Sequence, residues 1–592
     1  MTLTDKHKVA KILEEIAGLL EIQGENRFKC LAYVNAARAI EEFQGDLLEA
    51  AREGRLKGLK GIGQVLADKL TELITTGRLE YYDRLTAALP PGLLELLAVP
   101  NLGPKKIKVL YDRLGVASLG ELEYACVENH LVELPGFGKK TQDNILRGIW
   151  QLKRHRGQHL YSEAHPVAEE LLAALAACPA VQQQAIAGSL RRHKEVVKDI
   201  DLLASSEDPA AVMGHFVALS LVEKVEAQGP TKATVALTAG MRADLRVVAP
   251  EEFPYALQHL TGSQEHNTAL RGRARELGLK LNEYGLFQGE RRLPVASEAD
   301  LYARLGLAYI PPELREDRGE LEAAAEGRLP ELLQEEALTG AFHNHTTWSD
   351  GAASLEEMVR AAQALGWRYI GISDHSQAAA YAGGLQVERL RQQQSRIDEL
   401  NRQLEGITIL KGIEADILPD GSLDYDESVW QSFDFVIASV HSKFKLPEEE
   451  MTRRVLRVME NPYATMLGHL TGRLLLARDS YPLDLGAVIA AAARHGVLIE
   501  LNANPQRLEL DWRYWRQAAE AGVMTSINPD AHNTESLRHV RYGVGIARKG
   551  WLTAAHVLNT RPLEEVRALL ARRRPSGSQP APSRSATTPR GR

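Results

Sequence analysis

At residues 188–203 the sequence reads GSLRRHKEVVKDIDLL, a Gly-Ser turn with paired arginines that runs into an Asp-x-Asp segment. Because successive side chains of a strand point to opposite faces, Asp199 and Asp201 share one face while Ile200 points into the core. Two carboxylates on one strand edge favour a hard divalent cation such as Mg²⁺, whose other ligands are often substrate phosphates. The stretch therefore predicts a metal-assisted site at the edge of a sheet.

A third carboxylate stands in a second alternating segment, RADLRVV at 242–248, as Asp244. Three such carboxylates can hold two metal ions, which stabilise both the attacking and the leaving oxygen of an in-line displacement. A lone Asp-x-Asp pair is more often a solvated strand face. The Gly-Ser turn, Arg192 and Asp244 together favour the catalytic interpretation.

With these residues the chain resembles the family X DNA polymerases of the nucleotidyltransferase superfamily. The resemblance implies that Asp199 and Asp201 bind Mg²⁺ or Mn²⁺. It also implies that Asp244 binds metal and activates the primer 3′ hydroxyl. The positions that match the family's triphosphate-binding turn are Gly188, Ser189 and Arg192.

The composition indicates a soluble protein of several domains. Single cores stop growing at roughly 250 to 300 residues, and this chain has 592. With 44% hydrophobic residues, 25% charged residues and a net charge of -7, any nucleic-acid surface must be local. The three scattered cysteines favour neither a disulfide framework nor a thiolate zinc site, which fits a reducing cytoplasm. We find no apolar signal core and no apolar run of membrane-spanning length.

Three glycine turns are repeated near the N-terminus, each leading into a helix-forming segment with lysine. They read KGIG at 60–63, NLGP at 101–104 and PGFG at 135–138. Unpaired backbone N–H groups at such helix starts bind phosphate, so the turns predict a sequence-independent grip on DNA. They resemble the helix-hairpin-helix motif, and residues 51–157 carry 17 Lys and Arg against 12 Asp and Glu. The glycines expected at DNA are Gly61, Gly63, Gly103, Gly136 and Gly138.

Lys69 lies on the helix expected after the first glycine turn. It matches the lysine with which some family members attack an abasic deoxyribose as a Schiff base. An exposed lysine is more often solvated or near phosphate, and a nucleophile needs a lowered pKa. Lys69 is therefore a candidate lyase nucleophile whose role stays open.

The family resemblance continues through a Thr-Gly-Ser turn at 261–263. Gly262 and Ser263 match the turn that lies against the nucleotide sugar. The aromatic pair that usually precedes it is replaced by His259-Leu260, which leaves sugar discrimination undetermined. Asn267 matches a residue that contacts the incoming base, and Arg271 one that contacts the template.

A second set of metal-ligand residue types lies between residues 340 and 570, at the ends of short apolar strands. Helical stretches alternate with these strands, which predicts a parallel β/α fold with reactive groups at the strands' C-terminal ends. Imidazole ligands suit Zn, Mn or Fe better than Mg. The candidate ligands are His343, His345, Asp350, His375, Glu414, His441, His469, Asp530 and His532, whereas His495, His539 and His556 are left as ordinary histidines.

This region resembles the PHP family, named for polymerase and histidinol phosphatase. The family uses up to three metal ions, here expected to be Mn²⁺ or Zn²⁺, to cut phosphate esters by activating water. Ala341 stands where an acidic residue often precedes the first histidine pair, so we expect tuning of the site rather than its loss.

The expected fold is multidomain, α+β and α/β, with a helical N-terminal region, a nucleotidyltransferase palm with a mixed or antiparallel sheet, and a distorted (β/α)7 PHP barrel. Nine acids against three arginines in 313–336 predict a solvated tether. The expected domains are 1–85 helical with the possible lyase, 86–155 helix-hairpin-helix, 156–255 palm, 256–315 thumb, 316–338 acidic linker, 339–570 PHP and 571–592 disordered basic tail.

The predicted function is gap-filling DNA repair synthesis fused to a PHP nuclease with 3′-5′ exonuclease activity. Abasic-site cleavage and 3′-end processing are further candidate activities of the nuclease. The expected partners are gapped or primer-template DNA and dNTPs, with no membrane and with the chain acting as a cytoplasmic monomer. Two alternatives remain open. In one the PHP domain is mainly structural, and in the other it is a small-molecule phosphatase.

Overall fold

The computed structural model describes residues 5–43, 46–59, 61–90, 92–100, 102–132, 134–153 and 157–575. The chain divides into two compact units, Met1–Lys153 and Arg154–Arg592. Within the described ranges no helix combines the length and apolar character that crossing a bilayer requires. Lys60, Asn101 and residues 576–592, the larger part of the expected basic tail, lie outside these ranges.

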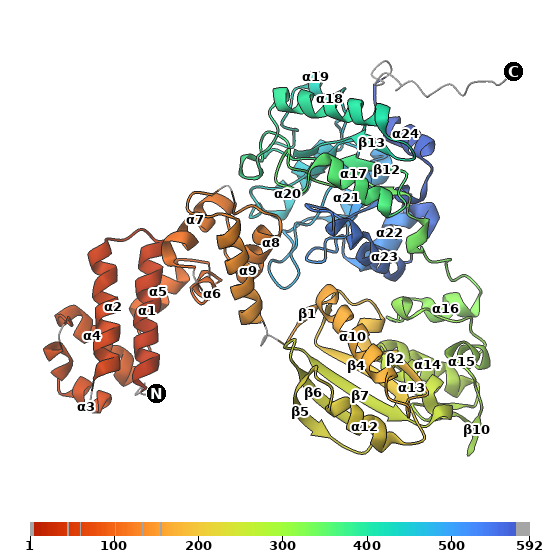
Figure 1. Cartoon of the computed structure of the whole chain (residues 1–592), viewed down its shortest axis with the longest axis horizontal. Coiled ribbons are helices and arrows are strands. Elements are labelled where there is room, and N and C mark those ends of the chain that lie inside the picture. The colour runs from red at the N-terminus through yellow and green to blue at the C-terminus, as the bar shows by residue number, and fades with distance from the viewer. Residues whose placement is uncertain are drawn as a thin grey trace. The chain divides into compact units, whose positions relative to one another are not determined.

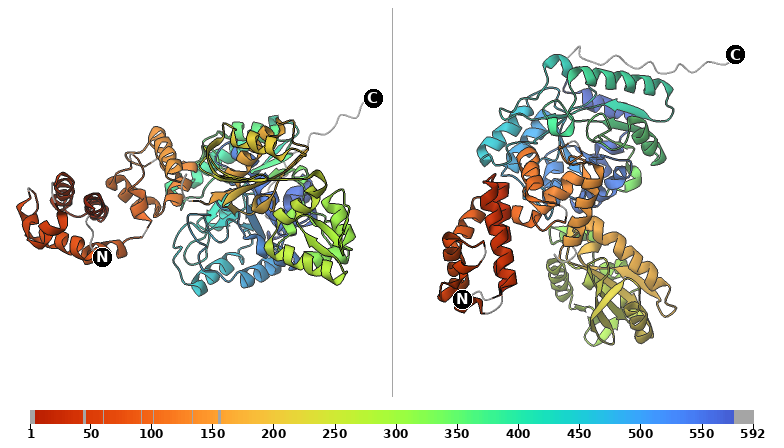
Figure 2. Two further views of the ribbon diagram at one scale, coloured as in Figure 1. Left: turned by 90° about the horizontal axis from the view of Figure 1, so that it is seen from below. Right: turned by 60° about the vertical axis from the view of Figure 1, so that its left-hand side comes forward.

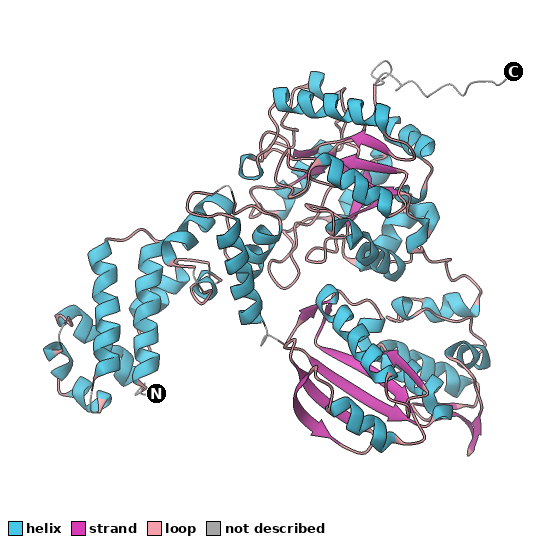
Figure 3. Ribbon diagram, viewed as in Figure 1, coloured by secondary structure: helices cyan, strands magenta, loops and turns pink. Residues whose placement is uncertain are grey.

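The first unit is helical, as expected (Figure 3). Helices α1 and α2 lie side by side and share one buried apolar cluster with α4 (Figures 1 and 2). A second cluster joins the helices from Leu93 onward. The helices are α1 Lys6–Ile22, α2 Arg27–Glu42, α3 Leu47–Arg52, α4 Gln64–Thr76, α5 Glu80–Ala87, α6 Leu93–Leu96, α7 Pro104–Leu114, α8 Leu119–Val127 and α9 Lys139–Lys153.

A five-stranded mixed sheet forms the palm at the start of the second unit. Strands β4 and β7 are parallel neighbours, and the other pairs are antiparallel, so the expected mixed sheet is confirmed. Helices α10 (Tyr161–Ala176) and α12 (Pro209–Val217) pack on it through one apolar cluster. The strand order is β2 Gln183–Ile186, β4 Asp199–Ser205, β7 Arg242–Val248, β6 Lys232–Leu237 and β5 Val222–Gln228.

The thumb follows the palm directly. Helix α13 packs against the palm sheet through Leu203, Val248 and Phe253. The thumb's own hydrophobic core includes Tyr255, Leu270, Leu286 and Leu301, which come from successive elements. These elements are α13 Phe253–Thr261, α14 Gln264–Glu276, β8 Lys280–Asn282, β9 Gly285–Gln288, β10 Arg291–Leu293 and α15 Glu298–Arg304.

The acidic segment after the thumb is only partly the solvated tether that its charge predicts, because six of its nine acids are exposed and three are buried or partly buried. Glu313 is 7% exposed and Glu320 is fully buried. Glu313 accepts a hydrogen bond from Arg548 at 2.7 Å, and Glu320 pairs with the buried His266 at 2.7 Å. The expectation of solvated acids is wrong for Glu313 and Glu320, because these acids pair with cationic side chains that are distant in sequence. The segment includes α16 Glu320–Ala325.

The remaining residues form the expected distorted barrel of parallel strands. Strands β13 and β14 follow one another with two residues between them, and pair with β12 and β15 respectively. An isolated parallel bridge between Asn344 and Ala531 links the first and last strands. The strands are β11 Gly340–Ala341, β12 Tyr369–Ile372, β13 Thr408–Lys411, β14 Glu414–Asp416, β15 Ile437–Ser439, β16 Met466–Leu467, β17 Leu498–Asn502 and β18 Thr525–Asn528.

Helices flank these strands (Figure 1). They are α17 Leu355–Ala364, α18 Val387–Gln403, α19 Glu427–Trp430, α20 Glu448–Val458, α21 Leu485–His495, α22 Trp515–Glu520, α23 Val540–Lys549 and α24 Leu563–Ala571. The expected disorder from residue 571 onward is wrong for Arg573, whose half-buried guanidinium donates to the carbonyls of Ala464 and Met459.

Candidate functional site

Three carboxylates come together at one end of the palm sheet. Asp201 and Asp244 are register partners on the parallel strands β4 and β7, and Asp199 shares the face of Asp201. Burial, followed by the charges of Asp199 and Asp244, raises the pKa of Asp201 to about 6. Lys232 Nζ lies 3.4 Å from Asp244 Oδ2, and the Thr234 hydroxyl donates to the other carboxylate oxygen. The three carboxylates repel one another, and a bound divalent cation would relieve that repulsion. The three residues therefore fit a metal site.

Gly188 allows the carboxylate of Asp201 to lie against the turn that begins the four-residue helix α11 (Gly188–Arg191). Its φ is +61°, in the left-handed region, and an added Cβ would lie 1.9 Å from Asp201 Oδ2. No side chain other than hydrogen fits without displacing the carboxylate. The glycine therefore places this turn directly beside strand β4.

A pocket of about 420 Å³ opens at Asp199 and Asp201, and Asp244 is not among its lining residues. Palm residues and thumb residues line this pocket together. In the sequence they were grouped only by their family resemblance. Its lining consists of Gly188, Ser189, Arg192, Asp199, Asp201, His259, Leu260, Gly262, Gln264, Asn267 and Arg271.

The thumb wall of this pocket is held by its own hydrogen bonds. Asn267 donates to the carbonyl of His259 at 2.7 Å and accepts from Gln258 at 2.7 Å. Arg271 Nε donates to the Asn267 carbonyl at 3.1 Å. Ser263 does not line the pocket: it is 4% exposed, and its hydroxyl caps α14 by accepting from His266 N.

Lys69 lies between two tyrosine rings in the first unit. Its Nζ donates to the Tyr33 hydroxyl at 2.7 Å and lies 3.2 Å from the centroid of the Tyr81 ring. Burial, then the charges of Lys29 and Arg84, lowers the pKa of the Lys69 ammonium. A lowered pKa increases the neutral amine fraction that a nucleophile requires.

The glycine turns begin helices as predicted. Gly63, Gly103 and Gly138 immediately precede α4, α7 and α9. Gly61 and Gly136 have φ values of +90° and +83°, which glycine adopts readily. Around Gly63, Gly103, Gly136 and Gly138 no atom of the described residues lies within 4 Å of an added Cβ, so the turns present open backbone.

The PHP residues converge on Glu414 at the C-terminal ends of the barrel strands. The distances from its carboxylate to ring nitrogens of His375, His441 and His469 are 2.9, 3.2 and 2.8 Å. His343 and His345 lie 3.4 and 3.6 Å away. Three overlapping groups could each hold an ion: His343, His345 and Asp530; His345, His375 and Glu414; and Glu414, His441 and His469.

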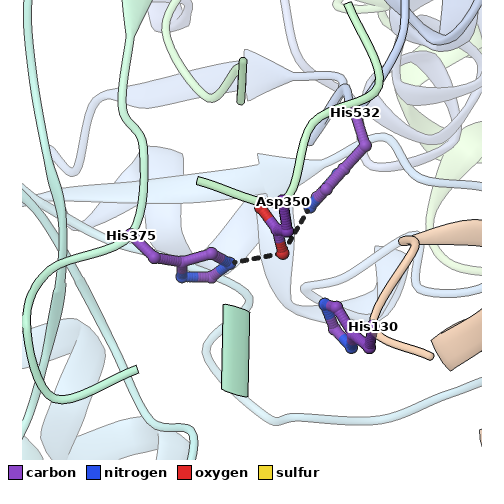
Figure 4. Close-up of side chains that lie close together, drawn as sticks. All are labelled: His130, Asp350, His375 and His532. Carbon is purple, nitrogen blue, oxygen red and sulfur yellow. Dashed lines mark ion pairs between the residues drawn. The ribbon is translucent and has the colours of Figure 1, made fainter. Parts of the chain in front are cut away.

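Asp350 lies between His375 and His532 of this cluster (Figure 4). Its Oδ2 lies 3.3 Å from His375 Nε2 and 3.5 Å from His532 Nε2. All nine predicted ligands therefore belong to one buried cluster within unit two. None of His495, His539 and His556 appears in the metal-ligand groups found among the described residues.

The electrostatics of the cluster suit cations. Burial disfavours charge on His343, but Glu500, Asp530 and Glu414 outweigh it and raise the pKa of His343 well above its usual value. Burial and the neighbouring His532 and His375 instead lower the pKa of His345 to about 3. Nε2 of His343 and both ring nitrogens of His345 are buried without hydrogen-bond partners among the described residues. Lone pairs aimed at carboxylates across 3.4 to 3.6 Å fit intervening metal ions.

Two residues that support the ligands were missed by sequence reasoning. Glu500 on β17 accepts from His343 Nδ1 at 2.7 Å and from His469 N at 2.7 Å. Asp416, two residues after Glu414, lies 2.6 Å from His441 Nδ1. Such carboxylates fix the ring orientation of a metal-binding histidine. The available signal was a carboxylate inside the otherwise apolar run VLIELN at 497–502.

Four family matches cover much of the chain. They are a helix-hairpin-helix domain at 4–79, a SAM-like helix-hairpin-helix tandem at 93–149, a DNA polymerase beta thumb at 256–316 and a PHP domain at 341–504.

Similar proteins extend these matches. The chain is 39% identical over 573 residues to the DNA polymerase/3′-5′ exonuclease PolX of Bacillus subtilis (strain 168), covering 96% of this chain and 99% of the relative. A probable phosphatase of Thermoanaerobacter sp. (strain X514) is 29% identical over 37% of this chain and 89% of its own length. A probable phosphatase of Acetivibrio thermocellus is 36% identical over 27% of this chain and 63% of its own length.

Proposed function

The chain belongs to the family of the DNA polymerase/3′-5′ exonuclease PolX, and we propose that its two donor clusters divide the two activities between them. The observation that carries this division is the difference in ligand chemistry. The palm cluster contains only carboxylates, which suit Mg²⁺ or Mn²⁺, whereas the barrel cluster is rich in imidazole, which suits Mn²⁺ or Zn²⁺.

In the palm, Asp199, Asp201 and Asp244 hold the cations for nucleotidyl transfer. Bound ions there neutralise charge on the triphosphate and stabilise the attacking and leaving oxygens. Asp244 takes the proton of the primer 3′ hydroxyl, whose oxygen attacks the α-phosphorus while the bond to the β-phosphate oxygen breaks. The products are an extended primer and pyrophosphate.

The pocket walls position the substrates. Gly188, Ser189 and Arg192 bind the triphosphate, and the Gly262 backbone lies against the sugar. Asn267 contacts the incoming base and Arg271 the template. Because His259-Leu260 replaces the family's aromatic pair, this wall also sets how strongly deoxyribose is preferred.

In the barrel, the nine ligands hold up to three cations for hydrolysis of a terminal phosphodiester bond. Bound ions there supply Lewis acidity to the phosphate and lower the pKa of water. Glu500 and Asp416 orient His343 and His441, and the buried cluster presents the donors at one end of the barrel. The same chemistry extends to abasic-site cleavage and 3′-end processing.

The relatives named as probable phosphatases favour one alternative, a small-molecule phosphatase in the barrel. They cover only 37% and 27% of this chain, whereas the helix-hairpin-helix matches and the full-length PolX match support DNA as substrate. Histidinol phosphate hydrolysed faster than a 3′-recessed duplex by the full chain would favour the phosphatase. Metal analysis that finds no bound ion in the purified protein would favour a structural barrel.

For the first unit we propose that Lys69 acts as a 5′-deoxyribose-phosphate lyase nucleophile. Its contact with Tyr33 and Tyr81, together with its lowered pKa, supports this role. Borohydride should trap a covalent adduct between the protein and a 5′-deoxyribose-phosphate end. Equal adduct from wild type and Lys69→Ala would eliminate the proposal.

The proposed substrates are gapped or primer-template DNA and dNTPs. The glycine turns at Gly61, Gly63, Gly103, Gly136 and Gly138 bind the DNA backbone during base excision repair in the cytoplasm. We propose that the protein acts as a monomer.

One primer-template assay, with and without dNTPs, in Mg²⁺ and then in Mn²⁺, tests the division of labour. Extension with dNTPs and shortening without them are the expected results. A protein that performs only one of the two under every condition contradicts the proposal.

A further inference from the structure

The residues that join the triphosphate turn to the metal-ligand strand form a loop, Arg192–Glu195, which we name the bridging loop. It follows α11 and leads into β3 (Val196–Val197) and then β4. The loop therefore connects Ser189 at the proposed triphosphate site with Asp199 at the metal site. Each of its four residues lies against a residue of the PHP barrel.

Lys549, the last residue of α23 in the barrel, is fully buried beneath the bridging loop. Its Nζ donates to the Arg192 carbonyl at 3.0 Å and to Glu316 Oε1 at 2.5 Å. Glu316 in turn accepts from Arg192 Nε at 3.1 Å and lies 3.3 Å from Lys194 Nζ. One barrel ammonium thus fixes both the backbone and, through Glu316, the side chain of Arg192.

His193 packs against the same barrel helix, α23, at Gly545, which has no side chain. Its backbone is left-handed, with φ +52°, and its ring stacks on Tyr161 with centroids 4.8 Å apart. A Cβ added to Gly545 would lie 2.3 Å from His193 Nδ1. Glycine at this helical position leaves the space that the His193 ring occupies.

The end of the loop is held by further barrel residues. Arg473 donates to Glu195 at 2.7 Å, and both side chains are largely buried. Lys194 Nζ lies 5.3 Å from the centroid of the Trp512 ring. On the other side, Arg192 Nη1 donates to the Thr261 carbonyl, next to Gly262 in the pocket wall. Arg192 is therefore held between the thumb turn and the barrel.

From these contacts we propose that the PHP barrel sets the position of Arg192 in the nucleotide pocket, so that Lys549 and Gly545 are positioning residues for DNA synthesis although they belong to the nuclease domain. This inference rests on the proposed triphosphate-binding role of Arg192. A displacement of α23 would displace the bridging loop and with it Arg192. A small displacement of this charged side chain would strongly weaken dNTP binding.

Gly545→Ala is the decisive variant. Alanine favours a helix over glycine by about 1 kcal/mol, so the substitution should not weaken α23 itself, yet its methyl group displaces His193. We expect the KM for dNTP to rise about ten-fold with a smaller change in kcat, because misplaced groups cost up to ~100-fold. Single-nucleotide insertion on a primer with nuclease-resistant 3′ phosphorothioate linkages measures this. Exonuclease activity on unmodified DNA without dNTPs should be unchanged.

The controls separate a specific effect from a general one. Gly214→Ala in α12 adds the same methyl group to a helix with nothing within 4 Å, and should leave the KM unchanged. In a His193→Gly background, which suits the left-handed backbone, adding Gly545→Ala should cause no further rise. Lys549→Met should raise the KM in the same direction, again with exonuclease activity retained.

Two outcomes would overturn the inference. One is an unchanged dNTP KM in Gly545→Ala, and the other is an equal rise with and without His193. Arg192→Ala distinguishes this failure from failure of the proposed function. If Arg192→Ala leaves the KM unchanged, the triphosphate role of Arg192 is wrong. If it raises the KM while Gly545→Ala does not, only the barrel's positioning role is wrong.

Discussion

Arg315 is fully buried in the thumb and donates through Nη1 to Glu298 Oε1 at 2.6 Å. Glu298 also accepts from Arg191 at 2.6 Å, so one carboxylate pairs with two guanidinium groups. Glu298→Ala should cost about 3–5 kcal/mol of unfolding free energy because it leaves a buried charge unpaired. Denaturant unfolding of the full chain measures the loss. A change below about 1 kcal/mol, typical of a surface pair, would contradict the prediction.

Gly188→Ala should abolish DNA synthesis while leaving exonuclease activity intact. The added methyl group would meet Asp201 Oδ2 at 1.9 Å, and the φ of +61° is unfavourable for alanine. Primer extension should fall at least ~100-fold, since this displaces a metal ligand. Gly272→Ala, where an added Cβ meets nothing within 4 Å, is the matched control. Retained synthesis in Gly188→Ala would show that the turn does not place Asp201.

Ligand variants should separate the two activities. Asp199→Asn with Asp201→Asn should abolish primer extension but spare 3′-5′ degradation, because these residues lie in the palm pocket. His343→Ala with His345→Ala should do the reverse. Both activities are followed on one labelled primer-template, and circular dichroism checks the fold. Loss of both activities in either folded variant would argue against two separate sites.

Glu500→Gln should weaken metal binding in the barrel although Glu500 is not among the predicted ligands. Its carboxylate accepts from His343 Nδ1 at 2.7 Å and holds the ring's orientation. Loss of such a partner lowers metal affinity about 10- to 100-fold. Titration of the metal-stripped protein with Mn²⁺ measures the affinity directly. Glu564→Gln, on the exposed side of α24, is the control, and equal affinities in the two variants would contradict the prediction.

His193 should make stability depend on pH below neutrality. Burial, with Glu313 opposing and His165, Lys549 and Arg548 reinforcing it, lowers the pKa of His193 to about 4. Between the unfolded value of 6.5 and 4, the unfolded state binds the extra proton, so stability falls as pH falls.

His193→Asn tolerates the left-handed backbone and removes this titration. Between pH 6.5 and 4 it should reduce the slope of unfolding free energy by up to about 1.4 kcal/mol per pH unit. Urea unfolding at several pH values measures the slope in both proteins. Parallel slopes would mean that His193 is not the group responsible.

Residue patterns predicted the local parts of both sites. Alternation placed Asp199 and Asp201 on one face, and the ends of apolar strands identified Glu414 and the barrel histidines, because strand geometry depends on neighbours in sequence. Asp244 was grouped with Asp199 and Asp201 only as a third carboxylate in another alternating segment, and the structure supplies the strand register that pairs it with Asp201.

Long-range charge pairing could not be predicted. Counting charges in 313–336 treats every acid as solvated, whereas Glu313, Glu316 and Glu320 meet Arg548, Lys549 and His266 only in the folded chain. Glu500 was missed for the same reason, since its partner His343 lies on another strand.

The buried acids Glu313 and Glu316 also bear on how freely the polymerase and nuclease parts can move relative to each other. A solvated tether would let the nuclease swing toward DNA that stays on the polymerase. Ion pairs from Glu313 and Glu316 to α23 instead tie the thumb's exit to the barrel. Moving the thumb and the barrel apart would therefore require breaking largely buried ion pairs, Glu313 with Arg548 and Glu316 with Lys549.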